Sequence, residues 1–183
     1  MSDTIIIGFS RPPANQFPPP VFAWAIMAFE SIVARKKVNF SHSYVRFHSD
    51  SYSRDLLYQA SGLRVNFIGF PMFLSQEIVV HEFVIPVSAE TKQAVIQFAI
   101  DNVGAPYALL NAFGIVAVKF MALFGKKIKN PVNQKGHFCS ELTALTVKDF
   151  LDATKSKLSV DDVKRMMPID DYNFLAANFG GGS

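Results

Sequence analysis

The chemistry that this sequence could perform centres on its single cysteine, Cys139. Turn-forming residues, among them Pro131, Asn133 and Gly136, precede the cysteine, and apolar residues at helical spacing follow it. We therefore expect Cys139 at or near the N-terminus of a helix, where unpaired N–H groups and the helix dipole stabilise a thiolate, the nucleophilic form. Position alone, however, favours the plainer interpretation of a small buried hydrophobic side chain.

A cysteine nucleophile needs a base within hydrogen-bond reach and a further group that orients the base. The chain offers four histidines, His42, His48, His81 and His137. His42 lies within a strong strand pattern that can hold an imidazole rigidly, whereas His48 lies in a polar turn and nothing in the position of His137 favours it. His81 also lies in a predicted strand, so the residues alone leave more than one candidate base, of which His42 is the most rigidly held.

A metal site is the competing interpretation of the same residues. His42, His81, His137 and Cys139 could supply zinc ligands. The sequence contains neither Cys-x-x-Cys nor His-Glu-x-x-His, the spacings that mark common zinc sites. We rank zinc below thiol chemistry and expect no cofactor.

The elements that must position these residues are predicted from periodicity. Apolar and β-branched runs bounded by turn residues predict five strands, and the short spacing of the last four argues that these form an antiparallel meander. Ser88 is a predicted N-cap, and Gly104 with Pro106 ends the helix that it starts. The predicted strands are 4–9, 38–47, 55–61, 63–67 and 77–85. The predicted helices are 21–36, 89–103, 109–124 and 139–153. A short helix is also predicted from the capping box at Ser159 and Asp162 to Pro168, and a turn or helix at 170–179.

We expect helix 21–36 to pack into the core, because Phe22, Ile26, Phe29, Ile32 and Val33 recur at helical spacing. The order strand, helix, strands, helices predicts an α+β fold.

Composition limits the class of protein. The 183 residues suffice for one domain, half of them are hydrophobic, and the net charge is +3. The basic residues are scattered except for Lys126, Lys127 and Lys129, flanked by Lys119 and Lys135, which we interpret as a solvated turn that could touch an anionic surface. We expect no specific nucleic-acid binding, no disulfide, no signal peptide and no transmembrane segment, and hence synthesis in the cytoplasm.

Four short motifs resemble a known family. Residues 40–45 (FSHSYV) and 58–62 (YQASG) look like the histidine half of NlpC-type papain-like cysteine hydrolases, 138–142 (FCSEL) like the cysteine half, and 104–107 (GAPY) like the element before the cysteine. The histidine strand here comes first, which resembles the circularly permuted branch that includes YiiX-like and lecithin:retinol acyltransferase-like enzymes. The closing 167–171 (MPIDD) is also similar to the end of that branch.

The resemblance implies roles for individual residues. Cys139 would be the nucleophile, His42 the general base and Gln59 the group that orients His42. Tyr107 and the start of the cysteine helix at Ser140 would line the oxyanion pocket. Histidine, asparagine or an acid is more usual at the third position, so Glu82 is an alternative orienting residue.

The resemblance implies a single papain-like domain over residues 1–179, with an apolar and basic insert at 108–135 and a flexible tail at 180–183. The insert is an extra core helix, a lid, a lipid-facing surface or, over 108–125, a docking surface for protein partners.

We expect a cysteine peptidase or amidase that cleaves an amide bond in cell-wall peptide. The alternatives are a structural module of a larger assembly with weak or vestigial activity, and a lipid acyl hydrolase or transferase. The chain also resembles hydrolase-like proteins of tailed phages, which would place it in a virion.

Overall fold

The computed structural model describes residues 3–16, 20–61, 64–107, 109–123, 125–126, 137–151, 163–164 and 166–179, with the backbone alone described at 109–113, 123 and 151. The predicted loop at 131–136, most of the lysine cluster (Lys127, Lys129 and Lys135), the capping box at Ser159 and Asp162, and the tail at 180–183 lie outside the described residues.

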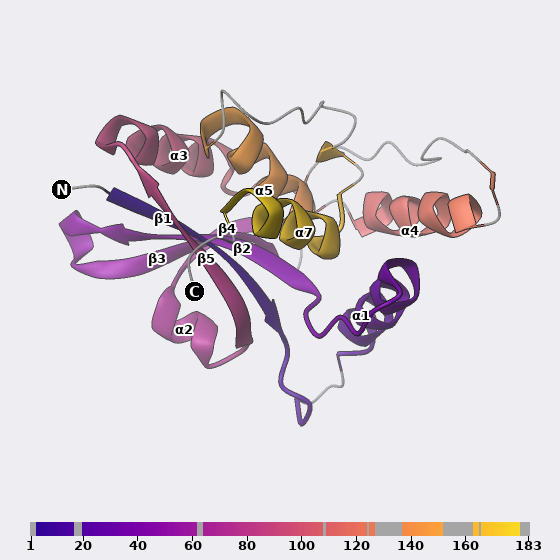
Figure 1. Ribbon diagram of the computed structural model, residues 1–183. Helices are drawn as coiled ribbons and strands as arrows, with labels where there is room; N and C mark the ends of the chain where they lie inside the picture. Colours follow the sequence, from indigo (N-terminus) through magenta and orange to yellow (C-terminus); the bar gives the residue numbers. More distant parts are fainter. Residues whose placement is uncertain are drawn as a thin grey trace.

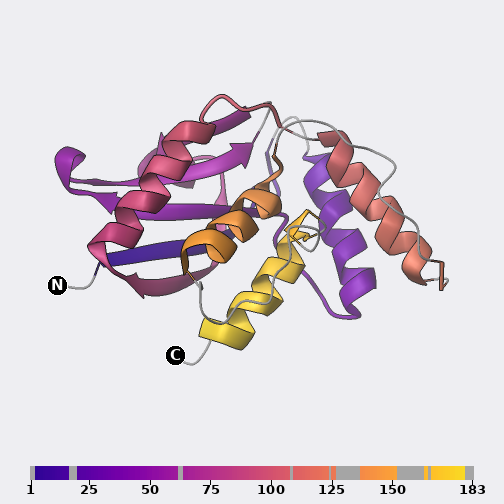
Figure 2. The ribbon, with the colours of Figure 1, turned by 90° about the horizontal axis from the view of Figure 1, so that it is seen from above.

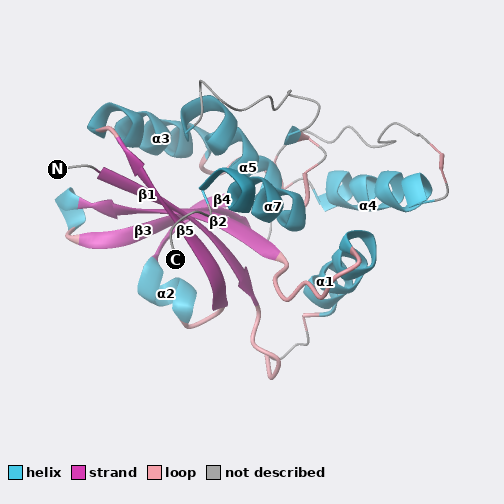
Figure 3. Ribbon diagram, viewed as in Figure 1, coloured by secondary structure: helices cyan, strands magenta, loops and turns pink. Residues whose placement is uncertain are grey.

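The described chain is an α+β structure built on one five-stranded antiparallel sheet (Figures 1 and 3). A 3₁₀ turn at Asp50–Tyr52 follows the second strand, and a π-helical stretch at Val147–Leu151 follows the helix that begins at Cys139. The strands are β1 (Asp3–Arg11), β2 (His42–Ser49), β3 (Arg54–Ser61), β4 (Arg64–Gly69) and β5 (Ile78–Val87). The helices are α1 (Val21–Ala34), α2 (Phe70–Leu74), α3 (Ala89–Asn102), α4 (Leu109–Leu123), α5 (Cys139–Thr146) and α7 (Pro168–Phe179), with η1 at Asp50–Tyr52 and η2 at Val147–Leu151.

The strand order corrects the predicted meander. The order is β4-β3-β2-β1-β5, so only β2, β3 and β4 form a meander. The first strand inserts between β2 and β5, and β4 pairs with β3 alone. The position of β1 follows from its composition, because Ile5, Ile7 and Phe9 are fully buried and a central strand can be covered by neighbours on both edges.

Several element ends also differ from the prediction. The second strand begins at His42 rather than at residue 38, because Val38 and Phe40 pack into the core from irregular backbone. The cysteine helix has regular α geometry only to Thr146. The Ser88 cap is confirmed, since its hydroxyl accepts the N–H of Thr91 at 3.2 Å.

Two layers of helices cover the sheet. Helices α3, α5 and α7 lie over one face, and the short α2 lies under the other (Figure 1). Alternate residues of β2 divide between these layers: Val45 and Phe47 pack with Leu142 of α5, whereas Tyr44 packs with Phe73 of α2. Side chains on β2 therefore face α5 at odd positions and α2 at even positions.

The prediction that helix 21–36 packs into the core is confirmed only in part. Ile26 and Phe29 pack against the core, but Phe22 and Ile32 are exposed, and the only fully buried residue of α1 is Glu30. The physical reason is that α1 lies beyond the end of the sheet beside α4, so that only one side of the helix meets the rest of the structure (Figure 2). No helix in the described part of the chain is long and apolar enough to span a bilayer.

Candidate active site

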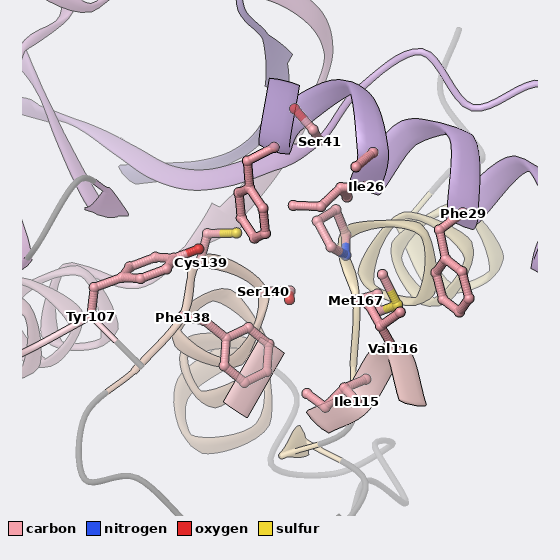
Figure 4. Close-up of a pocket in the computed structure, with 13 residues that line it drawn as sticks. Ile26, Phe29, Ser41, Tyr107, Ile115, Val116, Phe138, Cys139, Ser140 and Met167 are labelled. Carbon is pink, nitrogen blue, oxygen red and sulfur yellow. The ribbon is translucent and has the colours of Figure 1, made fainter. Parts of the chain in front are cut away.

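Cys139 is the first residue of α5 and is buried. The N–H groups of Ser43, Ser140 and Cys139 itself are directed at its sulfur. The Tyr107 hydroxyl points at the sulfur in Figure 4 and acts to lower the pKa of the thiol. An isolated bridge between Tyr107 and His137 holds the tyrosine beside the start of α5.

Contacts between α5 and the start of β2 fix the cysteine in place. The Thr143 hydroxyl lies 3.1 Å from both the Ser43 hydroxyl and the carbonyl oxygen of Cys139. The Ser140 hydroxyl donates to the carbonyl oxygen of Met166 at 2.8 Å. Short hydroxyl side chains let the helix approach the strand closely, which is why the N–H of Ser43 reaches the sulfur.

The resting site favours the neutral thiol, contrary to the sequence-based expectation of a thiolate. Burial raises the pKa of the Cys139 thiol above its ordinary value. The three N–H groups and the Tyr107 hydroxyl oppose this effect without overcoming it. The donors around the sulfur are therefore groups that stabilise a thiolate once a base has removed the proton.

His42 and Gln59 are brought together by the pairing of β2 with β3. The Nε2 atom of His42 lies 2.7 Å from Oε1 of Gln59, and Nε2 of Gln59 donates to Oδ1 of Asn66 at 3.4 Å. Because an amide oxygen only accepts, Nε2 of His42 carries the proton and Nδ1 is left as the basic nitrogen. Burial lowers the pKa of His42, so the imidazole is neutral at pH 7.

His42 and Cys139 reach the site from different sides of β2. Strand alternation turns Ser43 toward α5 and His42 toward the side of α2, where Gln59 lies. No hydrogen bond joins His42 to Cys139 among the described side chains. His42 is the first residue of β2, so its side chain lies at the end of the strand. At this end, no earlier residue of β2 lies between the face toward α5 and the face toward α2.

Two cavities meet at this end of the strand. The first has a volume of about 110 Å³, contains Cys139 in its wall and is otherwise almost wholly apolar (Figure 4). The second has a volume of about 710 Å³, contains His42 and Gln59 and has a more polar wall. Ser41 and Tyr107 belong to both cavities. The main apolar lining of the first is Ile26, Phe29, Ile115, Val116, Phe138 and Met167.

Glu82 does not lie at His42. Its Oε1 accepts from the Tyr44 hydroxyl at 2.8 Å and from Nε of Arg46 at 3.0 Å, and its Oε2 accepts from Nη2 of Arg46 at 2.6 Å. Gln59, and not Glu82, is therefore the residue whose side chain lies within hydrogen-bond distance of His42. Sequence alone could not separate the two residues, because both lie on strands near the candidate base.

The remaining histidines are apart from the pair. His48 Nδ1 lies 2.9 Å from Asp55, His81 packs its ring on Phe83, and His137 Nδ1 lies 3.7 Å from Glu141. Within the described ranges, no group of three or more histidine, cysteine or acidic residues has the geometry of a metal site.

Three acids around the site were not predicted from the sequence: Glu30 and Asp171, which are buried, and Glu77, which is half-buried. Glu77 lines the His42 cavity, and its charge raises the pKa of His42 against the effect of burial. Burial raises the pKa of Asp171, and nearby Asp170, Cys139 and Glu30 raise it further. No local signal marks these acids, because each comes close to the site only through contacts between elements distant in sequence.

Compared with known proteins, the chain matches no protein-family model, and no curated protein is similar enough to count as a match. The resemblance to NlpC-type hydrolases therefore stays a prediction that depends on the four sequence motifs.

Proposed function

We propose that the chain is a cysteine hydrolase of circularly permuted, papain-like architecture. Cys139 is the nucleophile, His42 the general base and Gln59 the orienting group. The observation that carries the proposal is the setting of the sulfur, which faces donors from Ser43, Ser140 and Tyr107 at the wall of a cavity. The hydrogen bond between His42 and Gln59 adds support, because it leaves Nδ1 free to accept a proton.

The reaction begins with transfer of the thiol proton from Cys139 to Nδ1 of His42. The thiolate attacks the carbonyl carbon of the substrate, a C–S bond forms, and the N–H of Ser140 and the Tyr107 hydroxyl stabilise the oxyanion. The leaving group departs with the proton from His42, which leaves a thioester on Cys139. Water then gives a proton to His42 and attacks the thioester, and the returning proton restores the thiol as the carboxylic acid leaves.

The first step requires a movement. His42 and Cys139 are not hydrogen-bonded to each other in the described structure, so the imidazole must rotate toward the sulfur or act through one bridging water. Since burial holds His42 neutral at pH 7, the ring is already in the form that accepts a proton.

The two cavities favour one of the three expected substrate classes. The cavity at Cys139 has an almost wholly apolar wall and a volume of about 110 Å³. It fits the first carbons of an acyl chain better than a polar cell-wall peptide. The larger cavity at His42 offers Gln59, Gln76 and Glu77 to a polar leaving group. We therefore propose a lipid acyl ester as the substrate ahead of cell-wall amide and isopeptide.

A structural or interaction module, such as a component of a phage particle, is the second candidate. The separation of His42 from Cys139 and the exposed apolar side of α1 favour it. Under this alternative the thiol would form no acyl-enzyme with any substrate.

The test incubates the protein with phospholipid, purified cell wall and isopeptide substrates, and mass spectrometry measures both released products and adducts on Cys139. We expect a fatty acid to be released from phospholipid and an acyl thioester on Cys139. Cys139→Ala and His42→Ala should abolish both products. His48→Ala is the matched control and should retain them.

Absence of product from all three substrates, or equal product from wild type and Cys139→Ala, would contradict the hydrolase proposal. Product from cell wall alone would support the hydrolase proposal but contradict the proposal that the substrate is a lipid.

A further inference from the structure

The exposed face of α1 consists of apolar side chains. Val21 and Ile32 are each 65% exposed and Trp24 is 41% exposed, and Ala25 and Ala28 are exposed between them. These five residues recur at helical spacing and form one continuous stripe, here called the α1 stripe. A contiguous exposed apolar surface of this kind marks an interaction site.

The hydrophilic residues of α1 point the other way. Glu30 is fully buried and accepts the N–H of Ile169, and the Ser31 hydroxyl accepts the N–H of Val38 at 2.9 Å. The usual arrangement of a surface helix, with polar residues toward water, is thus reversed. Both sides of α1 therefore carry apolar residues, one side toward the core and the other toward the surroundings of the protein.

Helix α4, which lies beside α1 in both Figure 1 and Figure 2, has the same arrangement. Phe120 is 50% exposed, and Ala117 is exposed on the same helix. Lys119, the one charged residue of α4, turns inward and pairs with Asp170.

The charge at the edge of this surface is positive. Arg35, Lys36 and Lys37 follow α1 directly and are exposed, and Lys126 is exposed after α4. The only acid of α1 is the buried Glu30. An apolar stripe with a cationic border complements an anionic lipid surface, where tryptophan is favoured at the interface and basic residues meet the head groups. A second copy of the chain would bring like charges together.

The stripe is also continuous with the site. Ala25 belongs to the α1 stripe and lines the apolar cavity that contains Cys139. An acyl chain lifted from a bilayer would therefore meet the cavity at the surface that contacts the bilayer.

We propose that the α1 stripe docks on an anionic phospholipid bilayer, with α1 lying in the interface, and that this contact delivers acyl chains to the cavity at Cys139. The delivery of substrate rests on the proposed function, whereas the docking itself does not.

Trp24 allows the docking to be measured directly, because it is the only tryptophan of the chain. The full chain bearing Cys139→Ala is mixed with phosphatidylcholine vesicles and with vesicles that also contain phosphatidylserine. We expect flotation with the anionic vesicles only, together with a blue shift of tryptophan fluorescence and quenching by lipids brominated on the acyl chain.

Variants test which residues carry the docking. Val21→Gln combined with Ile32→Gln should weaken partition into anionic vesicles at least about tenfold, because less apolar surface enters the interface. Lys37→Gln should weaken it roughly fivefold. The matched controls are Ile100→Gln, at a residue of α3 that is 53% exposed, and Arg54→Gln, and both should bind as the parent does.

Vesicle binding with unchanged Trp24 fluorescence would overturn the docking of α1, and so would equal weakening by the Ile100→Gln control. Self-association of the chain that buries Trp24 without vesicles would assign the stripe to a second copy. Because these measurements use Cys139→Ala, a loss of docking is distinguishable from a failure of the hydrolase proposal.

Discussion

His42 is acted on by two neighbours in different ways. Gln59 fixes the ring through a hydrogen bond and determines which nitrogen is basic. Glu77 makes no hydrogen bond to the ring among the described contacts, but its negative charge favours the protonated imidazole and so offsets part of the effect of burial. In the proposed hydrolase, Glu77 would thus supply the negative charge that a carboxylate supplies in many triads, while Gln59 would orient the ring.

Glu77→Gln should therefore lower the pKa of His42 further. Burial already holds this pKa below its ordinary value of 6.5, and removal of the Glu77 charge removes an opposing effect. We expect a measurable decrease, because a nearby negative charge favours the protonated imidazole. In the proposed hydrolase, the acid limb of the kcat/KM profile should move to lower pH with it.

NMR titration of the His42 ring, assigned by comparison with His42→Gln, measures this pKa without requiring activity. Glu90→Gln, at an exposed carboxylate on α3, should leave the titration unchanged. An unchanged or raised pKa in Glu77→Gln would contradict the assigned role.

A side-chain contact across β1 joins the second strand to the fifth. Gly8 pairs with Tyr44 of β2 on one side and with Glu82 of β5 on the other. The Tyr44 ring crosses directly over Gly8 and reaches Glu82, to which its hydroxyl donates at 2.8 Å. The absence of a side chain at Gly8 is what leaves room for this contact.

Gly8→Ala should destabilise the fold strongly. A Cβ at this position would lie 2.1 Å from Cζ of Tyr44, and the tyrosine is almost fully buried and cannot move freely. We expect the free energy of unfolding to fall by about 3 kcal/mol, which urea titration would measure. Gly69→Ala is the control, since its nearest neighbour would be 3.9 Å away, and a similar loss there would contradict the steric explanation.

A buried acid, Glu30, connects two helices that are distant in sequence. Glu30 of α1 accepts the N–H of Ile169 at 3.1 Å, and this contact links α1 to the first turn of α7. Burial raises the pKa of Glu30 to about 8, the N–H of Ile169 opposes the shift, and the nearby Cys139 and Asp170 increase it. Lys119 also opposes it.

The protonation of Glu30 makes stability depend on pH. Between the ordinary pKa of 4.5 and about 8, the folded state binds the proton of Glu30 and the unfolded state releases it. Stability from this group is therefore complete below pH 4.5 and is lost as pH rises toward 8, by up to about 1.4 kcal/mol per pH unit.

Glu30→Gln should remove this dependence. Urea unfolding of wild type and variant across that range should give free energies that diverge with rising pH, with the variant gaining relative to wild type. Parallel curves would contradict a protonated Glu30, and Glu90→Gln serves as the exposed control.

The sequence by itself determined the features that depend on neighbouring residues. The alternation of apolar residues located the strands, Ser88 located the start of α3, and the motif at 138–142 pointed to a helix that now begins at Cys139. The sequence also predicted that His42 and Gln59 lie on consecutive strands joined by a short turn, but it did not decide between Gln59 and Glu82 as the partner of His42.

Only the tertiary structure decided the features that depend on long-range contacts. The insertion of β1 into the sheet, the neutral thiol of Cys139, the partners of Glu82 and the exposure of the α1 stripe are all of this kind. Their common physical cause is that burial and charge at a residue are determined by elements distant in sequence, and periodicity within one element does not report them.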